Sequence, residues 1–174
     1  MQNLRTLCFV DTFDLLCSLR PRIGLFLPAG HVRELPLRSA RKGTDPADGD
    51  FVVSREASRW TEFKTTLGRL KRAGEAILGG ELEFGRIYLE MLDAGGVVPW
   101  RRETDPCSER FVHVVLPLRS NPMAVTYSGI ESATLAPGWL TIVNVRVPYG
   151  AVNFGDHARI HLVLDVRGKQ PATE

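Results

Sequence analysis

The chain has 174 residues and a mass of 19.3 kDa, enough for one domain that buries about 70% of the surface its unfolded form exposes. Hydrophobic residues make up 44% and charged residues 24%, which excludes wholesale disorder and a fibrous structure. The 22 basic and 20 acidic residues leave a net charge of +2, too small an excess to predict a nucleic-acid partner.

The start of the chain predicts neither a membrane segment nor a secretion signal. No apolar run approaches the ~18–20 residues of a membrane span. Asp11 and Asp14 interrupt the first apolar segment, and no cleavage site follows it. Cys8, Cys17 and Cys107 share no metal-ligand spacing, and the first two lie in an apolar stretch that predicts buried thiols. We expect a cytoplasmic protein without a membrane partner.

Residues 1–82 are predicted to cover a larger core with helices and loops. The first thirty or so residues are apolar segments interrupted by Pro21 and Pro28, which predict short strand or helix pieces. Residues 38–50 contain Gly, Pro, Asp and charged residues without periodicity. This composition predicts a surface loop or a mobile lid.

One helix is predicted after this loop. Ser54 can cap its N-terminus, and the Gly79-Gly80 pair can end it. Gly74 lies within it and costs about 1 kcal/mol relative to Ala. The apolar residues that recur at helical intervals are Trp60, Phe63, Leu67, Leu70 and Ile77.

From Glu83 onward the hydrophobic period is that of strands. Six or more short strands joined by tight turns behind one helical segment predict a β-sandwich or jelly roll with a helical flank. We therefore expect a single all-β domain, with α+β character only at the edges, in which a jelly-roll core spans 83–167 and a tail spans 168–174. The predicted strands are Phe84–Leu92, Val97–Arg101, Phe111–Leu118, Ala124–Tyr127, Trp139–Val145 and Arg159–Val166.

Several common chemistries lack their motifs. The sequence has no phosphate-binding Gly-rich loop before a Lys-Ser/Thr pair, no Gly-x-Ser-x-Gly and no dinucleotide fingerprint. What carries a recognisable pattern is the C-terminal half: it reads GRIYLEMLDAGGVVPWRRETDPCSERFVHVVLPLRSNP and later LAPGWLTIVNVRVPYGAVNFGDHARIHLVLDV.

This half resembles the aspartyl/asparaginyl β-hydroxylase family of Fe(II)/2-oxoglutarate dioxygenases. The resemblance covers roughly Glu83 to Val166, about half of the chain. Its most specific part is the ending, where Asn153, Gly155 and the segment Arg159–Asp165 are similar to the family's closing strand. The resemblance implies the cupin-like double-stranded β-helix (jelly-roll) fold, in agreement with the strand spacing.

The residues that would hold iron depart from the family's pattern. The resemblance implies a His-x-Asp or His-x-Gly near the second core strand and a distal His about ten residues before the closing-strand Arg. Ten residues before Arg159 stands Tyr149; at the other position either Trp100 takes the His slot or Arg101-x-Glu103 replaces the motif. A guanidinium repels a cation, and a phenol must lose a proton of pKa near ~10 before it binds a metal well. We expect no metal and no cofactor.

The anion-binding half of the implied pocket is retained. Arg159 matches the Arg that binds the distal carboxylate of 2-oxoglutarate, and Arg110 with His113 matches the strand that contacts this cosubstrate. Arg110 could equally be a surface charge and His113 a buried core histidine. His161 shares a strand face with Arg159. The residues expected to bind a small carboxylate-bearing substrate are Arg159, His113, Arg110, Trp100, Arg102 and His161.

Tyr149, Glu103 and Arg101 are the catalytic candidates. A hydroxyl, a carboxylate and a guanidinium can perform acid–base chemistry without metal, and nearby Arg101 or Arg102 would lower the pKa of Tyr149. This predicts a non-oxidative enzyme of small-molecule biosynthesis: a cyclase, lyase, dehydratase or isomerase. Two alternatives stay open. One is a genuine Fe(II)/2-oxoglutarate hydroxylase with atypical metal ligands, which would require Fe(II) and 2-oxoglutarate as cofactors. The other is a non-catalytic binding module in which Tyr149 only fills the volume left by the metal.

Overall fold

The computed structural model describes residues 2–29, 32–42, 44 and 50–169. Its elements before the long helix are β1 (Leu4–Phe9), α1 (Phe13–Leu19), a 3-10 helix (Arg20–Leu25), β2 (Leu27–Ala29), β3 (Val32–Ala40), β4 (Phe51–Val53) and α2 (Arg55–Arg59). After these come α3 (Thr61–Leu78), β5 (Leu82–Leu92), β6 (Val97–Arg101), α4 (Pro106–Arg110), β7 (Val112–Arg119), β8 (Ala124–Ser128), β9 (Glu131–Ala133), β10 (Trp139–Val143), β11 (Tyr149–Asn153) and β12 (Arg159–Gly168).

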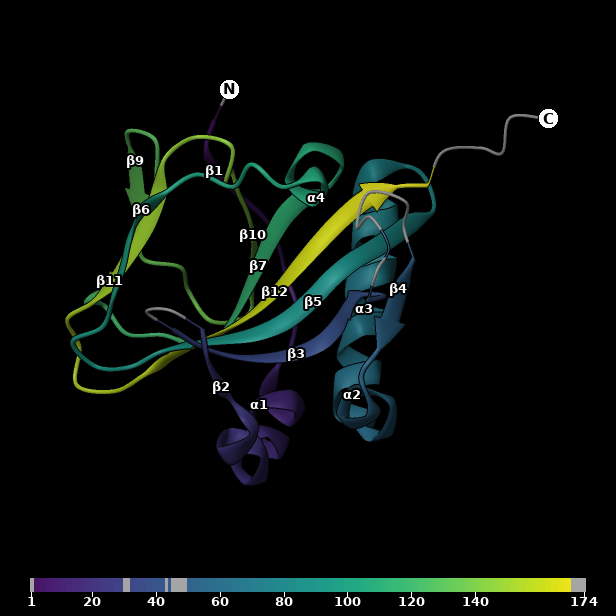
Figure 1. Ribbon diagram of the computed structural model, residues 1–174, viewed down its shortest axis with the longest axis horizontal. Helices are drawn as coiled ribbons and strands as arrows, with labels where there is room; N and C mark the ends of the chain where they lie inside the picture. The colour runs from purple at the N-terminus through teal and green to yellow at the C-terminus, as the bar shows by residue number, and fades with distance from the viewer. Residues whose placement is uncertain (1, 30–31, 43, 45–49, 170–174) are drawn as a thin grey trace.

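These strands form two antiparallel sheets, which confirms the jelly-roll prediction. The major sheet has eight strands in the order β1-β10-β7-β12-β5-β3-β2, with β4 paired to β3. The minor sheet has four, in the order β6-β11-β8-β9. Figure 1 shows the minor sheet opposite the strands of the major sheet, with α3 behind the major sheet. The six predicted strands are all present, within two residues of the predicted ends.

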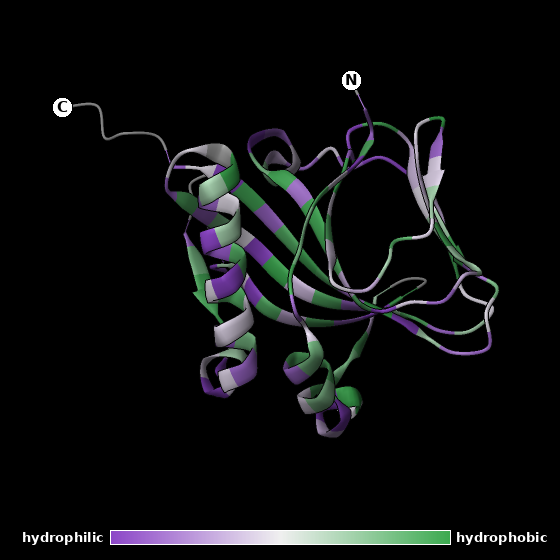
Figure 2. Ribbon diagram, turned by 180° about the vertical axis from the view of Figure 1, so that it is seen from behind, coloured by the Kyte–Doolittle hydropathy of each residue, from purple (hydrophilic) through white to green (hydrophobic). Residues whose placement is uncertain are grey.

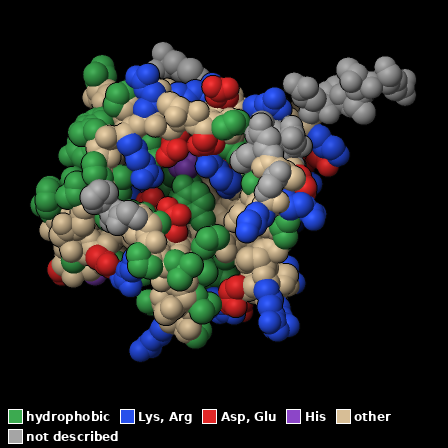
Figure 3. Space-filling model, in the orientation of Figure 1, with side chains coloured by type: hydrophobic (Ala, Val, Ile, Leu, Met, Phe, Trp, Pro, Cys, Tyr) green, Lys and Arg blue, Asp and Glu red, His purple; other side chains and the backbone are tan. Residues whose placement is uncertain are grey.

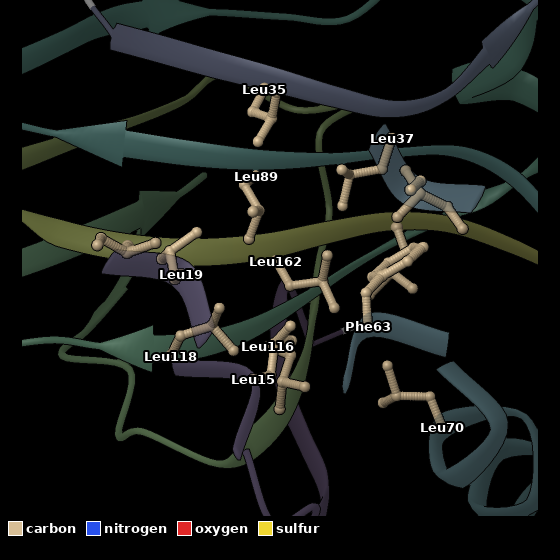
Figure 4. Close-up of a cluster of buried hydrophobic side chains, with 14 of the residues drawn as sticks. Leu15, Leu19, Leu35, Leu37, Phe63, Leu70, Leu89, Leu116, Leu118 and Leu162 are labelled. Atoms are coloured by element: carbon tan, nitrogen blue, oxygen red, sulfur yellow. The ribbon is translucent and has the colours of Figure 1, made fainter. Parts of the chain in front are cut away.

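Side chains of the central strands alternate between two cores, because successive residues of a strand point to opposite faces. Leu89, Leu116 and Leu162 are fully buried on the face that α1 and α3 cover, as Figure 4 shows. Val115 and Val163 point the other way and pack between the two sheets. The space between the sheets is where the polar side chains described below lie.

The predicted single helix is two helices, α2 and α3, separated at Trp60. Ser54 caps α2 as expected, because its Oγ accepts a hydrogen bond from the backbone N–H of Ala57 at 3.1 Å. Trp60 has extended backbone angles, and its fully buried indole donates to Ser18 Oγ at 2.7 Å. Gly79 ends α3 in the left-handed conformation with φ of 71°. The buried indole therefore holds Trp60 at the turn between α2 and α3.

The N-terminal part contributes more to the sheet than a cover would. β1, β2, β3 and β4 are all strands of the major sheet, and β3 lies beside β5. Of the predicted 38–50 loop, residues 38–40 belong to the end of β3, and 43 and 45–49 lie outside the described residues, as does 170–174 of the predicted tail. The prediction that Cys17 is buried is wrong, because this thiol is exposed at the surface of α1. None of the helices described is long and apolar enough to cross a membrane.

Candidate functional site

A small cavity of about 30 Å³ lies between the two sheets of the jelly roll. A cavity of this size has room for a few water molecules at most, and it is too small for a substrate the size of 2-oxoglutarate. Acidic, basic and histidine side chains gather at the centre of the face drawn in Figure 3. The polar residues that line the cavity are Glu90, His113, Thr126, Tyr149, Arg159 and His161.

Arg159 of β12 is paired inside the protein. Its Nη2 donates to Glu90 Oε1 at 2.5 Å, and its Nη1 donates to Thr126 Oγ1 at 3.2 Å. Only 4% of Arg159 is exposed. Burial lowers the pKa of this guanidinium, and the negative charge of Glu90 opposes that effect. The residue predicted to bind a substrate carboxylate therefore already binds the carboxylate of β5.

Tyr149, Arg101 and Glu103 come together as predicted, and we refer to them as the Tyr149 cluster. Arg101 Nε donates to the Tyr149 hydroxyl at 2.6 Å, and that hydroxyl donates to Glu103 Oε1 at 2.5 Å. Burial and the hydrogen bond to Glu103 raise the pKa of Tyr149, and they outweigh the opposing charge of Arg101. The expectation of a lowered pKa is wrong, because the phenol is buried and its hydroxyl donates a hydrogen bond to a carboxylate, and these two effects outweigh that of Arg101.

Asp165, near the C-terminal end of β12, is the centre of a second cluster of polar side chains. It accepts from Arg86 Nε at 2.5 Å and contacts His113 Nδ1 at 3.2 Å; Arg86 also reaches Asp105 at 3.4 Å. Burial opposes ionisation of Asp165, but the hydrogen bond from His113 and the charge of Arg86 hold its pKa below the usual value. Asp165 of β12 thus positions His113, which lies directly opposite it on the neighbouring strand β7.

His161 lies beside Arg159 on the inward face of β12, as the strand period predicted. It is 3% exposed, and its Nε2 has no hydrogen-bond partner among the described residues. Burial and the neighbouring charge of Arg159 lower the pKa of His161 well below its ordinary value. This imidazole is neutral at pH 7.

Three predicted site residues lie elsewhere. Trp100 is 59% exposed and packs against Tyr127 with ring centroids 5.7 Å apart, and it does not line the cavity. Arg102 is exposed after the end of β6. Arg110 was expected on a strand, but it is the last residue of the short helix α4 and is exposed. Arg101 and Glu103 do not line the cavity either, but they reach it through their hydrogen bonds to Tyr149.

The sequence reasoning missed the polar side chains of β3 and β5. Arg86 and Glu90 point inward from β5, and Glu34 of β3 is the cross-strand partner of Glu90. Burial and the charge of Glu90 raise the pKa of Glu34. The signal was present in the segment 86–91, where polar or aromatic residues alternate with Ile87, Leu89 and another apolar residue.

The residues present do not fit an iron site. Within residues 2–29, 32–42, 44 and 50–169, no group of three or more His, Cys, Asp or Glu side chains could hold a metal ion. At the position where the resemblance implies the distal His, the Tyr149 oxygen lies 2.6 Å from the guanidinium nitrogen of Arg101. A fixed positive charge at that distance opposes a cation, and a protonated phenol is a poor ligand for Fe(II).

No family model and no curated protein matches the sequence. Solved structures do match the fold. An oxidoreductase of the 2OG-Fe(II) oxygenase family from Burkholderia pseudomallei is 12% identical with a TM-score of 0.66, over 94% of this chain and 84% of that one. SnoN, a non-heme α-ketoglutarate-dependent epimerase from nogalamycin biosynthesis, is 9% identical with a TM-score of 0.64, over 95% and 76%. A prolyl-4-hydroxylase from Pseudomonas putida is 14% identical with a TM-score of 0.55, over 98% and 95%.

These likenesses show the fold. The chain has the double-stranded β-helix fold of the Fe(II)/2-oxoglutarate oxygenases. At 9–14% identity they carry no substrate or reaction over to it. The narrower resemblance to the aspartyl/asparaginyl β-hydroxylases stays a prediction.

Proposed function

We propose that this chain is an iron-free, non-catalytic binding module built on the oxygenase fold. The observation that carries the proposal is the Tyr149 cluster, in which a guanidinium and a carboxylate engage the phenol at the position of an expected iron ligand. With its hydroxyl donating to Glu103 and accepting from Arg101, Tyr149 fills this position as a structural residue.

The ligand of this module is proposed to bind at the open end of the cavity. The interior has only about 30 Å³ of space, and Glu90 already neutralises Arg159 there. Arg101 is a partly exposed cation: 42% of its side chain is exposed, and its Nε is engaged by the Tyr149 hydroxyl at 2.6 Å and by Glu103 at 3.5 Å. A small carboxylate-bearing molecule, such as an oxo acid or an amino acid, would contact this guanidinium.

Arg101 and its neighbour Arg102 provide a matched pair of variants. We expect calorimetry with a panel of small oxo acids and amino acids, in buffer containing EDTA, to find at least one saturable ligand. Arg101→Gln should weaken that ligand about fivefold or more, since it removes a charged hydrogen-bond donor. Arg102→Gln should leave the affinity unchanged, because the hydrogen bond to Tyr149 comes from Arg101 and not from Arg102. Equal losses in both variants would contradict the assignment of Arg101.

Acid–base catalysis without metal is the second candidate. The 2.5 Å contact between the Tyr149 hydroxyl and Glu103 favours it, because a proton shared over this distance could be passed to a substrate. Arg101, Tyr149 and Glu103 would then act on the non-oxidative reactions of small-molecule biosynthesis predicted from the sequence.

Tyr149→Phe distinguishes the two candidates. For a binding module we expect the variant to keep the wild-type affinity within about threefold, and we expect no conversion of the bound ligand by wild type in an overnight NMR time course. If wild type converts the ligand and the variant does so about 10²–10⁴-fold more slowly, Tyr149 transfers a proton and the catalytic candidate is correct.

A further inference from the structure

An apolar groove of about 450 Å³ lies on the opposite face of the major sheet, beside α3. Figure 2 shows this face, where hydrophobic bands of the strands remain visible between α3 and the N-terminal strand. The groove is separate from the cavity of the Tyr149 cluster, because it is lined by the outward-pointing residues of the same strands. The lining residues that matter below are Ile77, Val112, Val114, Ile142 and Leu164, with Arg5.

The groove runs across the strands. Arg5 of β1 pairs in register with Ile142, Ile142 with Val114, and Val114 with Leu164, so one row of side chains crosses four neighbouring strands. From β1 to β12 this row covers three inter-strand spacings, about 14 Å at ~4.8 Å each. A linear hydrocarbon chain fits a volume and a length of this kind.

The packing of α3 leaves the rim of this groove open to solvent, whereas Val114 and Leu164 on its floor are only 5% and 1% exposed. At Gly74 the helix approaches β5 so closely that an added Cβ would lie 2.3 Å from Leu82 Cδ1. This contact seats α3 over the β5 side of the sheet. Ile77 and Val112, which line the groove, are each 44% exposed. An apolar surface that is hollowed and exposed in this way is typical of a ligand-binding groove.

The charges at the groove select for an anionic head group. Both charged residues of its lining are arginines. Arg167 donates to Glu83 at 2.9 Å, whereas Arg5 is exposed and forms none of the ion pairs found among the described residues. We propose that the groove binds a fatty-acid-like carboxylate, with the hydrocarbon chain along Ile142, Val114 and Leu164 and the carboxylate on Arg5.

Chain length and head group test this assignment directly. In calorimetry with octanoate, decanoate and dodecanoate, affinity should rise by about fourfold per added methylene until the groove is full. Arg5→Glu should lower the affinity for dodecanoate by about tenfold or more and leave the affinity for dodecanol unchanged. The reason is that dodecanoate has a carboxylate to contact the Arg5 guanidinium and dodecanol has none. Absence of saturable binding by every chain length would overturn the proposal, and so would equal dodecanoate affinity in wild type and Arg5→Glu.

Two valines of nearly equal exposure provide a matched control. Val112 lines the groove and is 44% exposed, and Val52 of β4 lies outside it and is 45% exposed. Val112→Asp should weaken both dodecanoate and dodecanol by about tenfold or more, because it places a charge against the chain, whereas Val52→Asp should change neither. Ile77→Ser on α3 replaces Val112→Asp if the latter lowers the Tm by more than Val52→Asp does. Unchanged binding in the groove variant would place the ligand elsewhere.

Discussion

Replacement of Arg159 by Ala is expected to destabilise the protein by about 3–5 kcal/mol, because it leaves a carboxylate in the interior without a counter-ion. The side chains of Arg159 and Glu90 are 5% and 11% exposed, and their charged atoms lie 2.5 Å apart. Loss of the guanidinium also removes the donor to Thr126. Urea unfolding at pH 7 measures the difference, with the m-value as a check on two-state behaviour.

Two further variants separate the buried charge from general damage. The double variant Arg159→Met with Glu90→Met removes both charges, and we expect it to regain most of the lost stability. Arg41→Ala breaks an exposed ion pair with Asp50, at 2.8 Å, and should cost less than about 1 kcal/mol. If Arg159→Ala costs no more than Arg41→Ala, the Glu90 pair is not the buried interaction described here.

Asp165→Asn is expected to cost about 3 kcal/mol at pH 7, because this side chain is 2% exposed and binds both Arg86 and His113. The pKa of Asp165 is lower in the folded protein than its ordinary value of about 3.9. Such a group stabilises the fold above its unfolded pKa, and the contribution is lost as pH falls through the folded value.

The pH dependence of that difference is the sharper test. At about pH 5 Asp165 is still ionised, and the gap in unfolding free energy between wild type and Asp165→Asn should be large. It should shrink as the pH falls below about 4, because protonation then removes the charge from wild type as the substitution does. A gap that stays constant down to pH 2 would show that the loss in Asp165→Asn is steric rather than ionic.

The core strands and the closing strand could be predicted because they are short runs rich in β-branched and apolar residues, separated by turn residues. The prediction that Arg159 and His161 share a face of β12 followed from the two-residue period of a strand. The three residues of the Tyr149 cluster could also be predicted to meet, since the family resemblance places both of their segments at the same end of the fold.

A β-bulge explains why Trp100 was placed wrongly. Tyr149 pairs with Arg101 and Ala151 with Val98, so two residues of β6 oppose Gly150 alone. The bulge moves the inward position from Trp100 to Arg101, which reaches Tyr149. A Cβ on Gly150 would lie 2.9 Å from the Val98 carbonyl oxygen, so Gly permits the close approach at this point. Without the bulge, alternation from the buried Val98 would point Trp100 inward and Arg101 outward.

Pairing between distant strands explains the rest. Glu90 and Arg159 are 69 residues apart, and their contact depends on β5 lying beside β12, an order that local sequence does not specify. β3 was not predicted, and it contains Pro36, a residue that disfavours a central strand; a register shift between Pro36 and Arg38 lets the strand pair with β5. The polar residue Glu34 reaches the site only through that pairing.

We expect this jelly roll not to use iron, because Arg101 and a protonated phenol occupy the position of an iron ligand. The most direct measurement reconstitutes the purified protein with Fe(II) under anaerobic conditions, determines bound iron by mass spectrometry, and follows succinate release from 2-oxoglutarate in air. The Tyr149 cluster predicts well under one equivalent of iron and no succinate above the protein-free control. One equivalent of iron together with succinate release would contradict it and would establish a hydroxylase with atypical ligands.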